Sequence, residues 1–337
     1  PGAMPPSRRW LSLLALCAGA RAAAPAQPQL RMVALDLDGT LLNRKHEASP
    51  AAVETLRELH AAGVVIALCS GRSHVAMYET ARRLQLPEVP LVCFNGALGL
   101  RCSADFLFGK GGEPEEMFKT PVPEEAAQGV LRHAAQRGEL VQYYVGPDIH
   151  VVCQTDDHVA LTHDYAALTG VAAHVYQKTY DEAIARGLPY KMLIMTREID
   201  STLDAARAAL PTSDVHLIRG TPPFFVECLH PAVNKGEGLR RLCGALSIPP
   251  SEVVAFGDGD NDLEFIKLAG LGMAMANARQ VLKDAADCVV EFDNDNDGVA
   301  RALRKLMLEG RFGSRLAQIE QERLADLAST QTGTGPA

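Results

Sequence analysis

From Met32 onward, the sequence alternates short apolar runs with longer stretches in which apolar residues recur at helical spacing. The first two runs cover residues 32–35 and 64–69, and each ends in a cluster of small and polar residues. Runs that are apolar at nearly every position are typical of strands covered on both faces by helices. The pattern therefore predicts an α/β fold built on an open, doubly wound parallel sheet.

The stretch between the first two runs carries the signals of a crossover helix. Ser49 is a suitable N-cap residue, Pro50 fits the first helical position, and Gly63 can end the helix. We therefore expect a helix over residues 49–62 that returns the chain to the start of the next parallel strand.

Three later runs, at residues 91–94, 252–256 and 272–275, also end in polar clusters. Ligands of open α/β sheets bind in the crevice beyond the carboxyl ends of the strands. If the runs are parallel strands, all of these clusters lie at such ends. The sequence therefore predicts one site at that edge, assembled from segments that are far apart in the chain.

A long segment in the middle of the chain breaks this rhythm. It contains helical stretches and two apolar runs, 140–145 and 149–153, whose close spacing is typical of a β-hairpin. We interpret the segment as an α+β domain inserted into the parallel one. The expected organisation is a leader (1–30), a first core part (31–102), the insertion (103–220), a second core part (221–312) and a C-terminal tail (313–337).

The leader differs in character from the rest of the chain. Arg8 and Arg9 precede an apolar run at residues 10–18, and no acidic residue occurs before Asp36. This layout is typical of a targeting peptide, either for the secretory pathway or for an organelle such as a plastid or mitochondrion, and a disordered extension is the alternative. The run is too short to span a bilayer, so we expect no stable membrane association of the mature protein.

Composition restricts the partners of the chain. Its 337 residues include 33 Lys and Arg against 41 Asp and Glu, a formal net charge of -8, so no basic surplus attracts nucleic acid. The eight cysteines lack the CxxC spacing of zinc sites, and several lie within apolar runs, so we expect buried free thiols. Both a monomer and a small homo-oligomer are compatible with the sequence.

Carboxylates follow two of the apolar runs. Asp36 and Asp38 follow the first run, and Asp258 and Asp262 follow the run at residues 252–256. Carboxylates held close together repel unless a cation or a shared proton relieves them, and Mg²⁺ is the usual cation where phosphate is also bound. A solvated turn is the alternative after the first run, because Asp and Gly are common turn residues.

Polar groups at the other strand ends favour a phosphate site. Ser70 offers a hydroxyl to a phosphoryl oxygen, and Gly71 allows the backbone to approach an anion closely. Lys235 supplies a cation at the head of a predicted helix. Together with the carboxylates, these groups predict a site for phosphoryl transfer.

The chain resembles the haloacid dehalogenase superfamily in four ordered motifs, which lie at residues 36–42, 69–72, 234–236 and 257–262. Residues 95–97 and 297–300 also match, and the insertion falls between the second and third motifs, which resembles the Cof-type subfamily. The resemblance implies a Rossmann-like core and a large cap of the C2B kind, formed by the insertion.

The resemblance also implies a role for each motif residue. Asp36 would be the nucleophile, and Asp38 would act as general acid and base. Asp36, Asp258 and the backbone carbonyl of Asp38 would hold Mg²⁺, while Ser70 and Lys235 would hold the phosphoryl group. Further contacts to phosphate or substrate are expected from Gly71, Arg72, Asn95 and Asn261, and an orienting role from Asp262.

We therefore expect a Mg²⁺-dependent phosphatase that hydrolyses a small phosphomonoester through an aspartyl-phosphate intermediate. Sugar phosphates are the first candidate substrates, and pyridoxal phosphate or flavin mononucleotide the next. A phosphotransferase or sugar-phosphate mutase is the nearest alternative, although the basic residues of the insertion, among them Lys191, show no cluster for a second phosphate. A non-catalytic metal- or phosphate-binding module is the third possibility.

Overall fold

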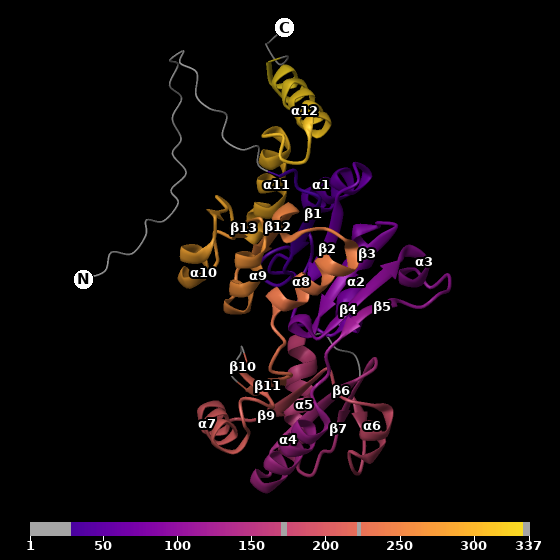
Figure 1. Cartoon of the computed structure of the whole chain (residues 1–337), viewed down its shortest axis with the longest axis vertical. Helices are drawn as coiled ribbons and strands as arrows, with labels where there is room; N and C mark the ends of the chain where they lie inside the picture. Colours follow the sequence, from indigo (N-terminus) through magenta and orange to yellow (C-terminus); the bar gives the residue numbers. More distant parts are fainter. Residues whose placement is uncertain (1–27, 170–173, 221–223, 333–337) are drawn as a thin grey trace, which may run out of the picture.

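The computed structural model describes residues 28–169, 174–220 and 224–332 (Figure 1). All but the end of the expected leader, residues 1–30, lies outside the described residues, so its targeting role stays a prediction. The described chain forms two lobes, a larger one that contains the first and last parts of the sequence and a smaller one built from its middle (Figure 1).

The larger lobe, called the core below, is organised around an eight-stranded sheet. The strands that run from β14 to β3 are parallel, and β1 lies in the centre, where Val33 pairs with Val254 on one side and Ile66 on the other. In sheet order the strands are β14 (Cys288–Val289), β13 (Leu271–Ala274), β12 (Val253–Gly257), β1 (Met32–Leu35), β2 (Val65–Cys69), β3 (Glu88–Cys93), β4 (Leu98–Ser103) and β5 (Glu115–Lys119).

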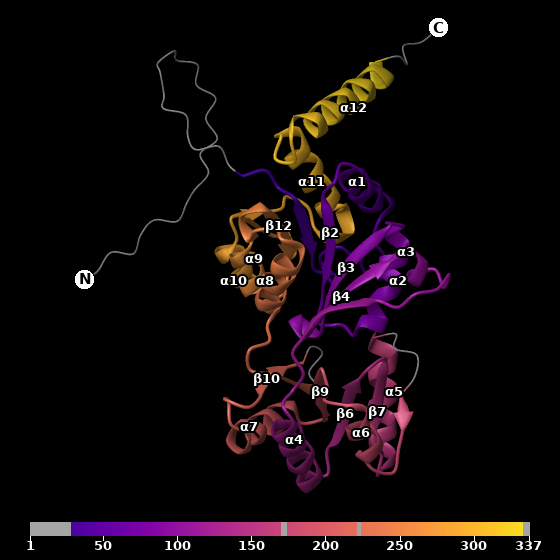
Figure 2. The same cartoon turned by 45° about the vertical axis from the view of Figure 1, so that its right-hand side comes forward.

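Helices cover both faces of the core sheet, as expected for a doubly wound fold (Figure 2). One layer contains α1 (Pro50–Ala61), α2 (His74–Leu84) and α11 (Gly298–Leu308), and the other contains α8 (Lys235–Leu246), α9 (Leu263–Leu268) and α10 (Gln280–Ala285). The predicted start of α1 is confirmed, because the Ser49 hydroxyl accepts a hydrogen bond from the Ala52 amide at 3.1 Å.

The smaller lobe, called the cap below, contains a six-stranded sheet with the order β10-β11-β9-β6-β7-β8. The predicted hairpin is confirmed, because its two strands pair antiparallel. The strands are β6 (Leu140–Val145), β7 (Asp148–Val151), β8 (Val175–Tyr176), β9 (Lys191–Met195), β10 (His216–Arg219) and β11 (Phe225–Leu229), and the helices are α4 (Glu124–Arg137), α5 (Asp156–Thr169), α6 (Asp181–Arg186) and α7 (Ile199–Ala209).

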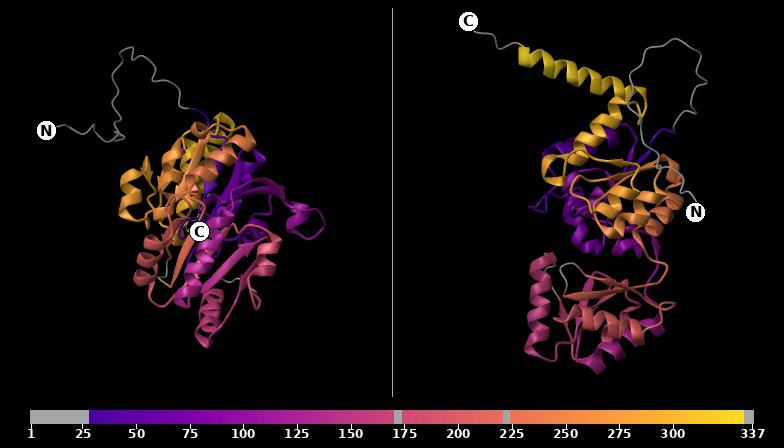
Figure 3. Two further views of the ribbon diagram at one scale, coloured as in Figure 1. Left: turned by 60° about the horizontal axis from the view of Figure 1, so that its bottom comes forward. Right: turned by 90° about the vertical axis from the view of Figure 1, so that its left-hand side faces the viewer.

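The two faces of the cap sheet have different surroundings. Side chains of α4 and α7 pack against one face in an apolar cluster with Tyr143 and Met192. The opposite face carries Tyr144 and Leu193, which belong to the apolar cluster of the core. Figure 3 shows the cap lobe next to the core lobe. The cap therefore presents this second face to the carboxyl ends of the core strands.

Strand pairing shifts both limits of the insertion from the expected residues 103 and 220. The strand β5 pairs with β4 at the edge of the core sheet, and β11 pairs with β9 in the cap sheet. The two linkers between the lobes are therefore residues 120–123 and 230–234. A short apolar run does not reveal its partner strand, because pairing depends on contacts far away in the sequence.

The expected C-terminal tail forms a helix, α12 (Ser314–Thr332), that projects from the core (Figure 2). Its first half is anchored by Glu320, which is buried and paired with Arg304 of α11 and Arg323 of its own helix. Arg304 also binds Glu58 of α1. The chain end is thus joined to the core by a small network of charges.

Two further expectations concern the cysteines and the membrane. The seven cysteines among the described residues are free, and five of them are buried, as the apolar runs around them predict. Within the described ranges, no helix combines the length and the apolar character that a bilayer span requires.

Two glycines allow α8 to approach the end of β3 closely. Gly96 has a φ of +107°, and a Cβ there would lie 2.4 Å from the carbonyl oxygen of Asn234. A Cβ on Gly238 would lie 2.6 Å from a methyl group of Val92 and 2.7 Å from the Cα of Gly96. This contact fixes the start of α8 against the core sheet.

Replacing Gly238 with Ala should therefore lower the free energy of unfolding by about 1–3 kcal/mol, because the added methyl overpacks a rigid contact. Gly244→Ala is the matched control in the same helix, since a Cβ there would meet no atom within 4 Å beyond the adjoining backbone of the helix itself. It should be neutral or stabilise by up to about 1 kcal/mol through helix propensity. Equal unfolding midpoints in urea for the two variants would contradict this account.

Candidate active site

The polar ends of the core strands gather at one cavity between the core and the cap. The cavity has a volume of about 740 Å³. Its lining includes Asp36, Asp38, Ser70, Gly71, Arg72, Asn95, Asp258 and Asn261 from the core, and Tyr144, Tyr165, Lys191, Phe225 and Glu227 from the cap. Residues separated by more than 200 positions in the sequence thus share one site.

Lys235 lies between two carboxylates in the floor of the site. Its Nζ donates to Asp36 Oδ1 at 2.7 Å and to Asp262 Oδ1 at 2.5 Å, and its side chain is fully buried. Burial alone would lower the pKa of Lys235, but the charges of Asp262 and Asp36 outweigh burial and raise that pKa above its ordinary value. The lysine therefore stays cationic beside Asp36.

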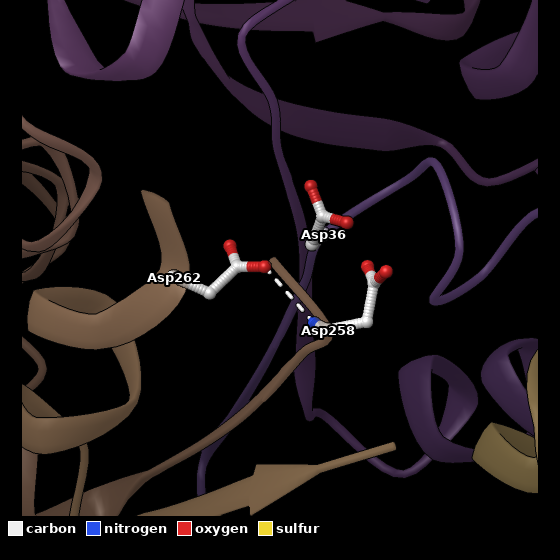
Figure 4. A group of neighbouring side chains, drawn as sticks. All are labelled: Asp36, Asp258 and Asp262. Carbon is white, nitrogen blue, oxygen red and sulfur yellow. Dashed lines mark hydrogen bonds between the residues drawn. The ribbon is translucent and has the colours of Figure 1, made fainter. Parts of the chain in front are cut away.

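Asp36, Asp258 and Asp262 form a cluster whose oxygens approach within 4.8 Å of one another (Figure 4). Thr40 Oγ1 donates to Asp258 Oδ1 at 3.0 Å. Asp262 Oδ2 accepts from the amides of Asp258 and Gly259 at 3.0 and 2.9 Å, while its other oxygen binds the lysine. Both oxygens of Asp262 are thus engaged in holding the loop and the lysine.

The electrostatics of this cluster fit a divalent cation. Burial raises the pKa of Asp36 well above its ordinary value, and the nearby Asp262 and Asp258 add to this while Lys235 opposes it. Burial and the charge of Asp262 raise the pKa of Asp258 to about 6. Three carboxylates with one ammonium leave net negative charge in a buried place, and an oxygen-only donor set suits a hard cation such as Mg²⁺.

Asp38 lies beside this cluster, and its carboxylate is turned toward Arg72. The guanidinium donates from Nε to Asp38 Oδ2 at 2.7 Å and from Nη2 to Oδ1 at 2.5 Å. His46 Nδ1 lies 3.4 Å from Asp38 Oδ1 and also lines the cavity. Sequence reasoning expected Arg72 at the substrate and did not find His46, which reaches the site through the turn after the first motif.

The strands β2 and β3 bring Ser70, Gly71 and Asn95 together. Ser70 Oγ accepts from the Arg72 amide at 3.2 Å. A Cβ on Gly71 would lie 3.0 Å from the Asn95 amide nitrogen, so the missing side chain leaves room for Asn95. Asn95 Oδ1 in turn accepts from Asn261 Nδ2 at 3.0 Å. Five residues predicted for the phosphate site, Ser70, Gly71, Arg72, Asn95 and Asn261, therefore line one cavity, and Lys235 lies behind Asp36 in its floor.

Three charged cap residues for which the sequence predicts no role at the site line the cavity, the exposed Arg219 and the buried Lys191 and Glu227. In the sequence, Lys191 is one of several scattered basic residues of the insertion. The one sequence signal of Lys191 and Glu227 is a charge within an otherwise apolar strand, at the start of β9 and in the middle of β11. Such a residue is seldom buried without a partner.

Comparison with known proteins assigns the chain to a family. The family of haloacid dehalogenase-like hydrolases matches residues 33–303. A Haemophilus influenzae protein provisionally named a phosphatase is 30% identical and matches over 82% of this chain and 96% of its own length. The phosphoglycolate phosphatase of Methanoculleus marisnigri is 28% identical over the same shares of the two chains.

A solved structure agrees with this assignment. The crystal structure of a haloacid dehalogenase-like hydrolase from Bacteroides thetaiotaomicron is 28% identical, with a TM-score of 0.69, and the match covers 82% of this chain and 100% of that one. The fold described above is thus shared with a solved relative over most of the chain. The protein therefore belongs to the haloacid dehalogenase-like hydrolases, as a phosphoric monoester hydrolase of the Cof type.

Proposed function

We propose that the protein is a Mg²⁺-dependent phosphatase that hydrolyses a small phosphomonoester through a phosphorylated Asp36. The observation that carries this proposal is the buried carboxylate of Asp36, held by Lys235 at 2.7 Å, next to Asp258 and at the wall of a cavity large enough for a metabolite. A positioned carboxylate divides hydrolysis into two easier transfers.

In the first transfer, a carboxylate oxygen of Asp36 attacks phosphorus, and the bond from phosphorus to the ester oxygen breaks. Asp38 gives its proton to the leaving oxygen. In the second transfer, water attacks the acyl phosphate while Asp38 takes up a proton, so that Asp36 is regenerated and inorganic phosphate leaves. Arg72 binds the side chain of Asp38 through two hydrogen bonds, and a phosphate dianion would compete for Arg72 and free Asp38 for proton transfer.

The remaining residues of the site offset charge and orient the phosphoryl group. Asp36, Asp258 and the backbone carbonyl of Asp38 would hold Mg²⁺, which would neutralise charge on the phosphoryl oxygens. Ser70 and Lys235 would bind the same oxygens, and the cap would exclude bulk water from them.

We propose a sugar phosphate as the first substrate class, with pyridoxal phosphate or flavin mononucleotide next. A cavity of about 740 Å³ suits a small metabolite. In Bacillus subtilis, the 5-amino-6-(5-phospho-D-ribitylamino)uracil phosphatase is 28% identical over 81% of this chain. Its name describes a phosphorylated polyol chain, which supports a hydroxylated leaving group.

Asp36→Asn should remove Mg²⁺-dependent release of inorganic phosphate, because an amide does not attack phosphorus. Asp38→Asn should lower kcat by about 10²–10⁴-fold through the loss of proton transfer. A panel of phosphomonoesters with phosphate detection measures both, and acid-quenched mass spectrometry should find the phosphoryl group on Asp36. Asp284→Asn, which changes an exposed carboxylate on α10, is the control. Full activity of Asp36→Asn would contradict the mechanism.

The stability of the folded protein should depend on pH, and Mg²⁺ should offset the loss of stability at higher pH. The raised pKa of Asp258, about 6, means that the folded protein keeps a proton that the unfolded chain has lost. Without the cation, this group's stabilising contribution is therefore present below about pH 4 and is lost as the pH rises through about 6. Mg²⁺ should consequently raise the thermal midpoint more at about pH 7.5 than at about pH 5.

The matched variant for this experiment is Asp258→Asn. It should weaken the effect of Mg²⁺ and flatten the pH dependence of the midpoint, because the titrating carboxylate is gone. Thermal unfolding followed by circular dichroism, with and without the cation, gives both results. A Mg²⁺ shift of the same size at both pH values in the wild type would contradict the assignment of the cation to these carboxylates.

A further inference from the structure

A buried ion pair lies on the face of the cap sheet that turns toward the core. Lys191 and Glu227 are 4% and 7% exposed, and Lys191 Nζ donates to Glu227 Oε1 at 3.0 Å. The ammonium also lies 5.0 Å from the ring centroid of Tyr144, its neighbour in the adjacent strand, and 5.8 Å from that of Phe94 in the core. We call Lys191 and Glu227 the latch.

Each member of the latch makes one hydrogen bond to the core. Lys191 Nζ donates to the carbonyl oxygen of Gly71 at 3.2 Å, and Asn95 Nδ2 donates to Glu227 Oε2 at 3.0 Å. Asn95 then accepts from Asn261. A continuous path of hydrogen bonds therefore runs from the second motif through the cap and back to the fourth motif.

The Glu227 side of the latch also sets the orientation of the side-chain amide of Asn95. Its NH₂ group must point at the Glu227 carboxylate, which only accepts, and its oxygen must point at the NH₂ group of Asn261. Asn95 has a φ of +53° and packs against Gly71, so its backbone leaves little freedom to adjust. A change at Glu227 would therefore be transmitted to the phosphate site through one amide group.

Burying two charges is costly unless both are paired and hydrogen-bonded, and each of these two charges takes one of its hydrogen bonds from the core. Opening the cap would break the bonds to Gly71 and Asn95 and admit water to the pair. We propose that Lys191 and Glu227 are positioning residues that lock the closed cap and orient Asn95 and Asn261 for phosphoryl transfer. This inference rests on the proposed function, because it concerns the same site.

The kinetic test is a double-mutant cycle between Glu227→Gln and Asn95→Ala. Glutamine has one acceptor oxygen where the carboxylate has two, so it cannot satisfy both Lys191 and Asn95. Each single variant should lower kcat by about 10–100-fold with little change in KM, since misplacement of a positioning group acts on the reaction step. The double variant should be no slower than the slower single variant.

Two kinetic results would overturn the inference. The first is a loss in the double variant equal to the product of the single losses, which would mean that Glu227 does not act through Asn95. The second is a loss that differs between a sugar phosphate and p-nitrophenyl phosphate, which would mean that the latch contacts the leaving group. A positioning role predicts the same fold-change for both substrates.

A second measurement does not depend on activity. The amides of Thr120, Val122 and Val233 lie in the two linkers and donate to Ala97 of the core, Pro189 of the cap and His230 of the second linker. We expect their hydrogen exchange to quicken when the linkers bend as the cap opens. Glu227→Gln should speed this exchange by about tenfold. Asp148→Asn, which breaks the exposed cap ion pair with Arg186, is the matched control and should leave the exchange unchanged. Unchanged exchange in Glu227→Gln would overturn the latch.

The two measurements separate the inference from the proposed function. Wild-type protein that hydrolyses no phosphomonoester with Mg²⁺ present, but whose linker exchange responds to Glu227→Gln, would refute the phosphatase proposal and leave the latch standing. If Glu227→Gln does not fold, Lys191→Met combined with Glu227→Gln removes both buried charges together and serves in its place. Faster linker exchange is again expected, because the bond to Gly71 is lost.

Discussion

The position of one ammonium group, that of Lys235, organises the site. It is fully buried and contacts both Asp36 and Asp262. A buried charge without a partner is costly, so the three segments that carry these residues must meet at this point. The start of α8 sets the place of the lysine, and close glycine contacts set the place of α8. Fold and site are therefore fixed by the same packing.

The charge balance around Lys235 also explains why the site suits a cation. One ammonium does not neutralise the carboxylates of Asp36, Asp258 and Asp262, and burial raises the pKa values of Asp36 and Asp258. Asp38 is arranged differently, because Arg72 holds its carboxylate at the mouth of the cavity. Neighbouring carboxylates thus occupy environments suited to different tasks.

Much of this arrangement could be predicted from local sequence. Asp36, Ser70 and Asp258 each follow an apolar strand, and the ends of parallel strands meet at one edge. The partners across the lobes could not be predicted in this way. The strand β5 joins the core and β11 the cap through non-local pairing, and Lys191 and Glu227 face Gly71 and Asn95 only because of how the cap docks.

The two linkers of the cap differ in what they join. The first follows β5, an edge strand remote from the acidic cluster, whereas the second ends at Asn234, the N-cap residue of α8, immediately before Lys235. When the cap is exchanged for that of a related protein, the chimaera should therefore tolerate inserted residues at the first junction far better than at the second. At the second junction, a single added residue would change the phase at which the helix begins and rotate the buried ammonium away from its partners.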